Sequence, residues 1–129
     1  MMDPVGCMVE VLPVPGRAAE RVITLILEGD LTLPDLAKVG DELFRLSSRG
    51  LRNVVLDMAQ VNHVDFRGIR PLVARAELFR SAGGDIRVSG VSGYLFHIFR
   101  AAGAHDAFQF FADPDNARAS FVPGVRLVG

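Results

Sequence analysis

The feature that most constrains the fold is a pair of short apolar runs, at residues 22–27 and 53–57, with one helical pattern between them. Neither run alternates polar with apolar residues, which is typical of strands that are buried on both faces of a sheet. Residues 34–49 carry apolar side chains every three or four positions, so we expect a helix with one buried face there. A helix that joins two such strands makes a right-handed crossover, and this predicts a parallel sheet.

Turn residues and periodicity divide the rest of the chain in the same way. In chain order, the further elements that we expect are a strand at 7–11 closed by Pro13, a turn at 29–32, a loop at 58–65, a helix from 66 to the glycines at 83–84, a strand at 86–88, a helix after Ser92, a strand at 108–110 and a short helix at 114–121. A short loop joins the first strand to the next, so we place it antiparallel at the sheet edge. The predicted fold class is α/β, with a mostly parallel sheet of four or five strands, an antiparallel N-terminal edge strand and about four helices.

The composition excludes several classes of protein. The 129 residues suit a single domain, 1–129, and no apolar run approaches the roughly 20 residues that span a bilayer. The formal net charge of −1 disfavours nucleic-acid binding, which draws most of its affinity from neutralised phosphates. The N-terminus lacks the basic start of a secretory signal, and the one cysteine, Cys7, cannot form an intramolecular disulfide. We therefore expect a cytoplasmic protein that is not inserted in a membrane.

The residue types that carry catalysis do not occur in a catalytic arrangement. His63, His97 and His105 are scattered, with no second cysteine, so no metal site is expected. Ser92 follows a strand and opens a helix, but the G-x-S-x-G pattern of a nucleophile elbow is absent and helix capping explains this serine. Asp57 is interpreted as a strand-end residue. We expect a non-enzymatic protein without a cofactor.

The segment 61–69 has the least ordinary helix start of the chain. Asp65 is suited to cap the helix, where its charge also complements the positive end of the helix dipole. Phe66 follows it, a large apolar residue where helices usually begin with a small or polar one. Two interpretations remain open: Phe66 packs back onto Leu33 or the 30–32 turn as a core edge, or it anchors a protein partner.

Three neighbouring residues add to this helix start. Arg67 and Arg70 are either solvated charges or contacts for an acidic partner. Pro71 has no N–H to donate to the Arg67 carbonyl, so we expect the first turn of the helix to be distorted.

Six short motifs, in order along residues 22–121, resemble the STAS domain family, which comprises bacterial anti-sigma-factor antagonists and the tails of sulfate transporters. The resemblance implies the STAS version of the α/β fold described above. The motifs are Gly29-Asp30-Leu31, Val54-Val55-Leu56-Asp57, Val64-Asp65-x-x-Gly68-Ile69, Gly83-Gly84, Val88-Ser89-Gly90-Val91-Ser92 and Ala102-Gly103-Ala104-His105-Asp106-Ala107-Phe108.

In the antagonist branch of that family, the helix start reads Asp, then a serine that a partner kinase phosphorylates, then Ser or Thr, then Gly. Asp65 and Gly68 match this pattern, whereas Phe66 stands at the phosphoacceptor position and Arg67 follows it. Neither side chain has a hydroxyl, so no phosphorylation is expected at the family position. Thr32 stands where the turn after the second strand often carries a second acid.

The resemblance implies a bacterial regulator that binds a cytoplasmic signalling protein, without the usual phosphorylation switch. Its partner would be an anti-sigma factor of the serine-kinase ATPase type or another STAS protein, and a homodimer is left open. Two alternatives remain: a structural subunit of a signalling assembly or lipid-transporter complex, and a module that binds a small ligand or nucleotide, with an anion at the helix N-terminus. The residues expected to contact the partner are Asp30, Thr32, Asp65, Phe66, Arg67, Gly68 and Arg70.

Overall fold

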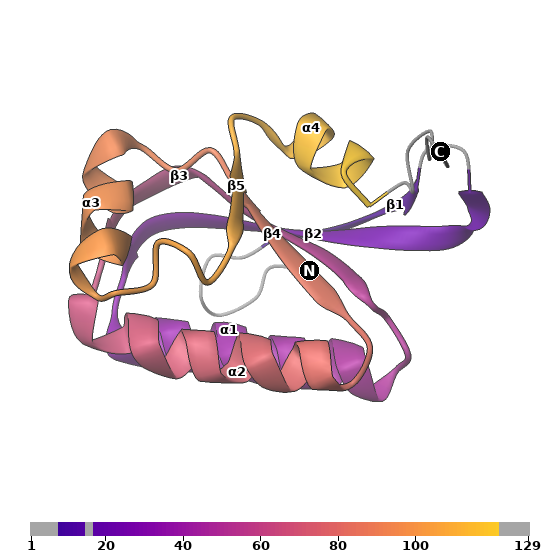
Figure 1. Ribbon diagram of the computed structural model, residues 1–129, viewed down its shortest axis with the longest axis horizontal. Helices are drawn as coiled ribbons and strands as arrows, with labels where there is room; N and C mark the ends of the chain where they lie inside the picture. Colours follow the sequence, from indigo (N-terminus) through magenta and orange to yellow (C-terminus); the bar gives the residue numbers. More distant parts are fainter. Residues whose placement is uncertain (1–7, 15–16, 122–129) are drawn as a thin grey trace, which may run out of the picture.

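A five-stranded mixed sheet, with the strands in chain order from edge to edge, organises the molecule (Figure 1). The computed structural model describes residues 8–14 and 17–121. β1 is antiparallel to β2 and all other neighbours are parallel, so the predicted fold class is confirmed. The elements are β1 (Met8–Val14), β2 (Arg17–Leu31), α1 (Leu33–Ser48), β3 (Asn53–Val64), the 3₁₀ turn η1 (Phe66–Gly68), α2 (Ile69–Ser81), β4 (Asp85–Ser89), α3 (Gly93–Ala101), β5 (Gln109–Phe111) and α4 (Pro114–Ala119).

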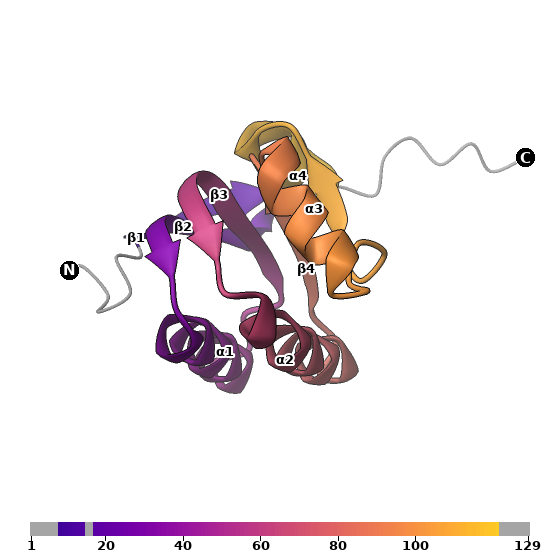
Figure 2. The same ribbon diagram turned by 90° about the vertical axis from the view of Figure 1, so that its left-hand side faces the viewer.

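Helices cover both faces of the sheet. α1 and α2 lie side by side against one face, α4 lies against the other, and α3 lies at the end of the sheet where α1 and α2 begin (Figures 1 and 2). Side chains of β2 therefore serve two cores: Ile23 and Leu25 pack in the large cluster with α1 and α2, while Val22 packs with Val55 and Ala117 of α4. This two-sided burial is what the unbroken apolar run at 22–27 predicted.

Two central strands are longer than the sequence pattern indicated. The turn expected at 29–32 and the loop expected at 58–65 were wrong, because β2 continues to Leu31 and β3 to Val64, and these extensions pair with each other. The pairing is irregular, with register shifts near Gly29, whose φ of 81° suits glycine. The β3 extension buries Met58, Val61 and Val64 at every third position, and Leu31 is buried at the end of β2. The backbone ladder and these apolar contacts therefore both hold the extensions, with a spacing that a two-residue alternation does not capture.

Smaller differences follow from local chemistry. Pro13 does not close β1 but lies within it, and β1 is an edge strand, where a residue without an N–H is tolerated. Cys7, expected in this strand, lies outside the described residues. The distorted helix start expected from Pro71 is confirmed, since 3₁₀ turn η1 precedes α2. β5 begins one residue later than expected, and α4 ends at Ala119.

Candidate functional site

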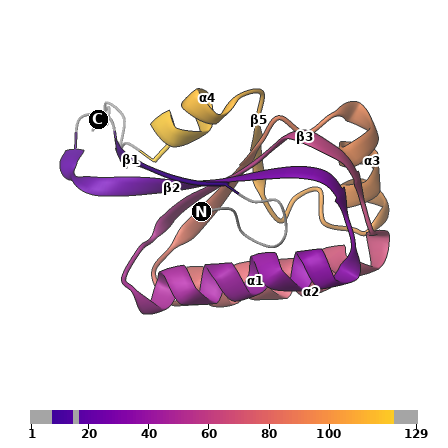
Figure 3. The same cartoon turned by 180° about the vertical axis from the view of Figure 1, so that it is seen from behind.

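The residues singled out around 30–32 and 65–70 meet at one end of the sheet. β2 and β3 end side by side, with Leu31 opposite Val64, and the chain then turns directly into α1 and η1 (Figure 3). The Asp65 N–H donates to the Leu31 carbonyl at 2.9 Å, which ties the two strand ends together. The extension of both strands thus places the two helix starts next to each other.

Asp65 and Arg67 hold each other at the start of η1. The Asp65 carboxylate accepts the Arg67 backbone N–H at 2.9 Å, the Arg67 Nε–H at 3.2 Å and an Nη2–H at 2.9 Å. The side-chain hydrogen bond from Arg67 is the main reason why the pKa of Asp65 lies below its ordinary value, and the backbone hydrogen bond adds to it. The same carboxylate raises the pKa of Arg67. The cap expected at Asp65 is present, and the Arg67 guanidinium forms an ion pair with Asp65 of the same chain.

Phe66 stands out from this braced turn. Its side chain is 52% exposed, although Val64 on one side and Gly68 and Ile69 on the other are buried. The interpretation of Phe66 as a core edge does not fit this exposure. The backbone around Phe66 is held on both sides while its ring faces solvent.

A shallow hollow of about 390 Å³ adjoins the Phe66 ring. Phe66, Arg67 and Arg70 line it from η1 and α2, and residues 101–103 line it from the end of α3. The hollow therefore joins an aromatic ring, two cations and the last turn of another helix on one surface.

Gly68 sets how closely η1 approaches α1. A Cβ at this position would lie 2.3 Å from Leu36 Cδ1 and 3.3 Å from Leu33 Cδ2. The φ of Gly68 is −89°, so the need for glycine comes from close packing and not from backbone conformation. Gly68 is buried, so its role is to let η1 pack closely on α1 and not to contact a partner.

Asp30 and Thr32 lie on the neighbouring strand end and are exposed. The Thr32 hydroxyl accepts the Asp35 N–H at 3.3 Å, and the Thr32 N–H donates to the Asp35 carboxylate at 3.0 Å, which forms a capping box for α1. Asp30 pairs in register with His63 of β3. Thr32 therefore has a structural task, whereas Asp30 presents its side chain at the rim of the surface.

The sequence pattern missed a contact that extends this surface. His63 Nδ1 lies 2.7 Å from the Tyr94 hydroxyl, and the two rings stack with centroids 5.8 Å apart. Tyr94 is 55% exposed. No local signal could reveal the pair, because the residues are 31 apart and His63 was placed in a loop.

The other polar groups that drew attention have structural partners. The Ser92 hydroxyl accepts the Leu95 N–H at 3.1 Å, as expected of a helix cap. Asp57 lies within β3 rather than at its end, and its carboxylate accepts the Ser89 hydroxyl at 3.3 Å and the Ala59 N–H at 3.2 Å. Within residues 8–14 and 17–121, His, Cys, Asp and Glu side chains form no group of three that could bind a metal ion.

Comparison with solved structures identifies the same architecture in several proteins. The Bacillus anti-sigma factor antagonist SpoIIAA, in its unphosphorylated form, aligns with a TM-score of 0.69 at 12% identity, covering 86% of this chain and 91% of that one. An anti-sigma factor antagonist from Mycobacterium paratuberculosis gives 0.68 at 15% identity, covering 93% and 97%. A sulfate transporter family protein from Wolinella succinogenes gives 0.63 at 22% identity, covering 86% and 88%. These likenesses concern the fold.

Sequence comparison gives a family but no individual match. No curated protein matches the chain significantly. In the part of the chain that the structure describes, no helix combines the length and apolar character needed to cross a membrane. A family model for the STAS domain matches residues 16–117, which is most of the chain. The protein therefore belongs to the STAS domain family.

Proposed function

We propose that this chain is a non-enzymatic regulator of the anti-sigma-factor antagonist type, and that it binds a cytoplasmic signalling protein through the surface around η1. The fold similarity to SpoIIAA and to the Mycobacterium antagonist supports this type of protein. The proposed contacts are Phe66, Arg67 and Arg70, with Asp30 at the rim, while Asp65, Gly68 and Thr32 hold the backbone in place.

The exposed Phe66 ring on a braced turn is the observation that carries this proposal. An aromatic side chain held at one position loses little conformational freedom on binding, and such residues dominate interface energetics. The turn is held by the Asp65–Arg67 hydrogen bonds, by the Asp65 N–H to Leu31 and by the close contact of Gly68 with Leu36.

The proposed binding is constitutive with respect to serine phosphorylation at η1. SpoIIAA has been solved in both unphosphorylated and phosphorylated forms. By the resemblance drawn from the sequence, the phosphoacceptor position is occupied here by Phe66, followed by Arg67, and neither has a hydroxyl. A phosphate would add nearly two negative charges at the interface, and this chain has no group at that position to carry them.

The direct test is a binding titration against the ATPase-type anti-sigma factors encoded in the same genome. We expect one of them to bind the wild-type chain, and Phe66→Ala to weaken the complex about thirty-fold or more, equivalent to about 2 kcal/mol. Peptide mapping after incubation with ATP is expected to find no phosphate on residues 65–68. Glu77→Ala, a change at an exposed position on α2, serves as a control. Equal affinities of wild type and Phe66→Ala would contradict the proposal.

A structural subunit is the second candidate, favoured by the fold similarity to the Wolinella sulfate transporter family protein. Affinity purification from the native cell separates the two candidates. A kinase-type ATPase recovered with the wild type and lost with Phe66→Ala supports the regulator. Recovery of transporter or other STAS proteins instead supports the subunit. A small anionic ligand is a weaker candidate at Arg67, because Asp65 already neutralises that side chain.

A further inference from the structure

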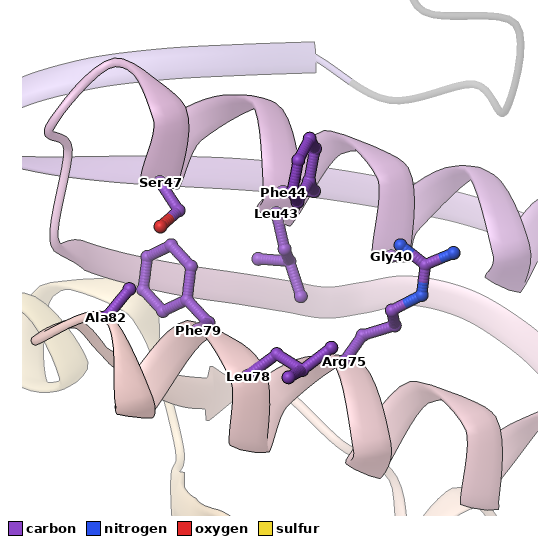
Figure 4. A pocket seen from close by; sticks show the side chains of 8 residues that line it. All are labelled: Gly40, Leu43, Phe44, Ser47, Arg75, Leu78, Phe79 and Ala82. Carbon is purple, nitrogen blue, oxygen red and sulfur yellow. The ribbon is translucent and has the colours of Figure 1, made fainter.

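The outer face of the α1/α2 layer carries an apolar groove far from η1. Among residues 9–12 and 21–121, whose side-chain exposure the structure describes, the two most exposed large apolar side chains are Phe44 of α1, 69% exposed, and Leu78 of α2, 66% exposed. They flank a hollow of about 220 Å³ between the two helices (Figure 4). Leu43 and Phe79 line its floor, and none of the described residues covers it.

An ion pair crosses the groove at one end. Arg75 Nη2 lies 3.2 Å from the Asp41 carboxylate, and both side chains remain largely accessible, at 43% and 68% exposure. The Arg75 stem can cross because α1 has Gly40 beneath it, where a Cβ would lie 2.8 Å from Arg75 Cγ (Figure 4). A glycine inside a helix costs about 1 kcal/mol relative to alanine, so the position that lets Arg75 cross lowers the stability of α1 by about that amount.

From these features, we infer that the α1/α2 groove binds a second copy of this chain as a symmetric homodimer. A twofold interface uses the same patch on both subunits, so that patch must hold both a protrusion and a recess. Phe44 protrudes beside the hollow, and in a twofold contact the Phe44 ring of each subunit enters the hollow of the other. Phe44 supplies an aromatic anchor for such a contact, and Leu78 lines the same hollow from the other helix.

The charges on the groove fit a second copy better than a charged peptide. One Asp and one Arg cancel, so two identical patches do not repel each other. Across a twofold axis, Asp41 of one subunit faces the partner's Arg75, and the pair exchanges its intramolecular contact for an intermolecular one. Along α2 the groove begins at Arg75, six residues or about 9 Å from Ile69 at about 1.5 Å per residue, and Leu78 lies about 14 Å from Ile69. The surface around η1 stays accessible in such a dimer.

Sedimentation over a concentration series tests the dimer. We expect the sedimenting mass of the wild-type protein to approach twice the 14.0 kDa of one chain at high concentration. Phe44→Ser and Leu78→Ser are each expected to raise the dimer dissociation constant at least about tenfold. Val9→Ser removes another exposed apolar side chain, from β1, and is the control: its dimer dissociation constant is expected to equal that of the wild type. Thermal melts of each variant verify that it folds. The inference is overturned if the wild type stays monomeric up to about 1 mM, or if Phe44→Ser leaves the dimer dissociation constant unchanged.

A charge swap distinguishes a twofold contact from every other use of the groove. Asp41→Arg makes the patch wholly positive and Arg75→Asp makes it wholly negative, so each variant alone is expected to be monomeric where the wild type is dimeric. Mixed in equal amounts, they restore a heterodimer, because every charge then faces its opposite. Absence of a heterodimer in the mixture, while the wild type dimerises, places the interface elsewhere and overturns the inference. Partner binding through Phe66 is measured separately, so failure here leaves the proposed function standing.

Discussion

The two helices that leave the carboxyl end of the sheet begin in opposite ways. At α1, the Thr32–Asp35 capping box satisfies the first turn, and Pro34 occupies a position where its missing N–H costs nothing. At α2, a 3₁₀ turn comes first, Asp65 caps it, and Phe66 projects into solvent. Both starts lie at adjacent strand ends and are well braced. Hydrogen bonds hold the backbone at both starts, but η1 also leaves an aromatic ring half exposed, and this is why we propose the partner contact there.

The largest expected effect on stability comes from Gly68→Ala, which forces a Cβ to within 2.3 Å of Leu36. We expect a loss of about 1–3 kcal/mol in the free energy of unfolding, the usual cost of overpacking, together with weaker partner binding as η1 shifts. Gly93→Ala is the matched control, because a Cβ there meets nothing within 4 Å and φ is not positive. Urea denaturation compares the two variants. Equal stability of both would show that η1 and α1 are not in tight contact.

Phe66→Ala separates binding from folding. Because the ring is half exposed, we expect its removal to change the free energy of unfolding by less than about 1 kcal/mol, while partner affinity falls by about 2 kcal/mol. Denaturant melts and the binding titration measure the two quantities, with Arg70→Ala as a second probe on the same surface. A stability loss of about 3 kcal/mol or more would make Phe66 a core residue and remove it from the site.

Thr32→Ala tests the complementary expectation at α1. Loss of the capping hydroxyl is expected to cost about 1 kcal/mol of stability. Partner affinity should change little, because the hydroxyl is engaged with Asp35 and its task is structural. Thr32→Ser keeps the cap and is the control. A large drop in affinity at unchanged stability would move Thr32 from the bracing residues to the contact residues.

The smallest effect concerns pH. Arg67 holds the pKa of Asp65 below its ordinary value, so the stabilising contribution of the ionised carboxylate is present above the unfolded-state pKa and is lost as pH falls through the folded-state pKa. Arg67→Ala should raise the pKa of Asp65 toward its ordinary value, although the backbone N–H of residue 67 still donates. An NMR titration of the Asp65 carboxyl carbon measures this. An unshifted pKa in Arg67→Ala would mean that the ion pair does not persist in solution.

The sequence by itself determined the elements whose signals are local. The apolar stripe at Leu36, Val39, Leu43 and Leu46 identified α1, and Ser92 and Asp113 cap α3 and α4 as their residue types indicate. The order of strands and helices was enough to predict a parallel sheet with one antiparallel edge, because crossover handedness restricts the topology. Asp65 and Gly68 were singled out by motif, whereas the extensions of β2 and β3 place them beside residues 30–32.

Only the tertiary structure decided what depends on contacts between distant segments. β2 and β3 extend to Leu31 and Val64 because their ends pair with each other, and the buried residues of the β3 extension recur every third position rather than in the alternation that predicts a strand. The exposure of Phe66 and the hydrogen bond between His63 and Tyr94 depend on the relative positions of η1, β3 and α3 in the folded chain. Residue patterns act over three or four positions along a helix or two along a strand, whereas the Phe44–Leu78 groove joins side chains 34 residues apart. Such juxtapositions exist only after the two helices have packed.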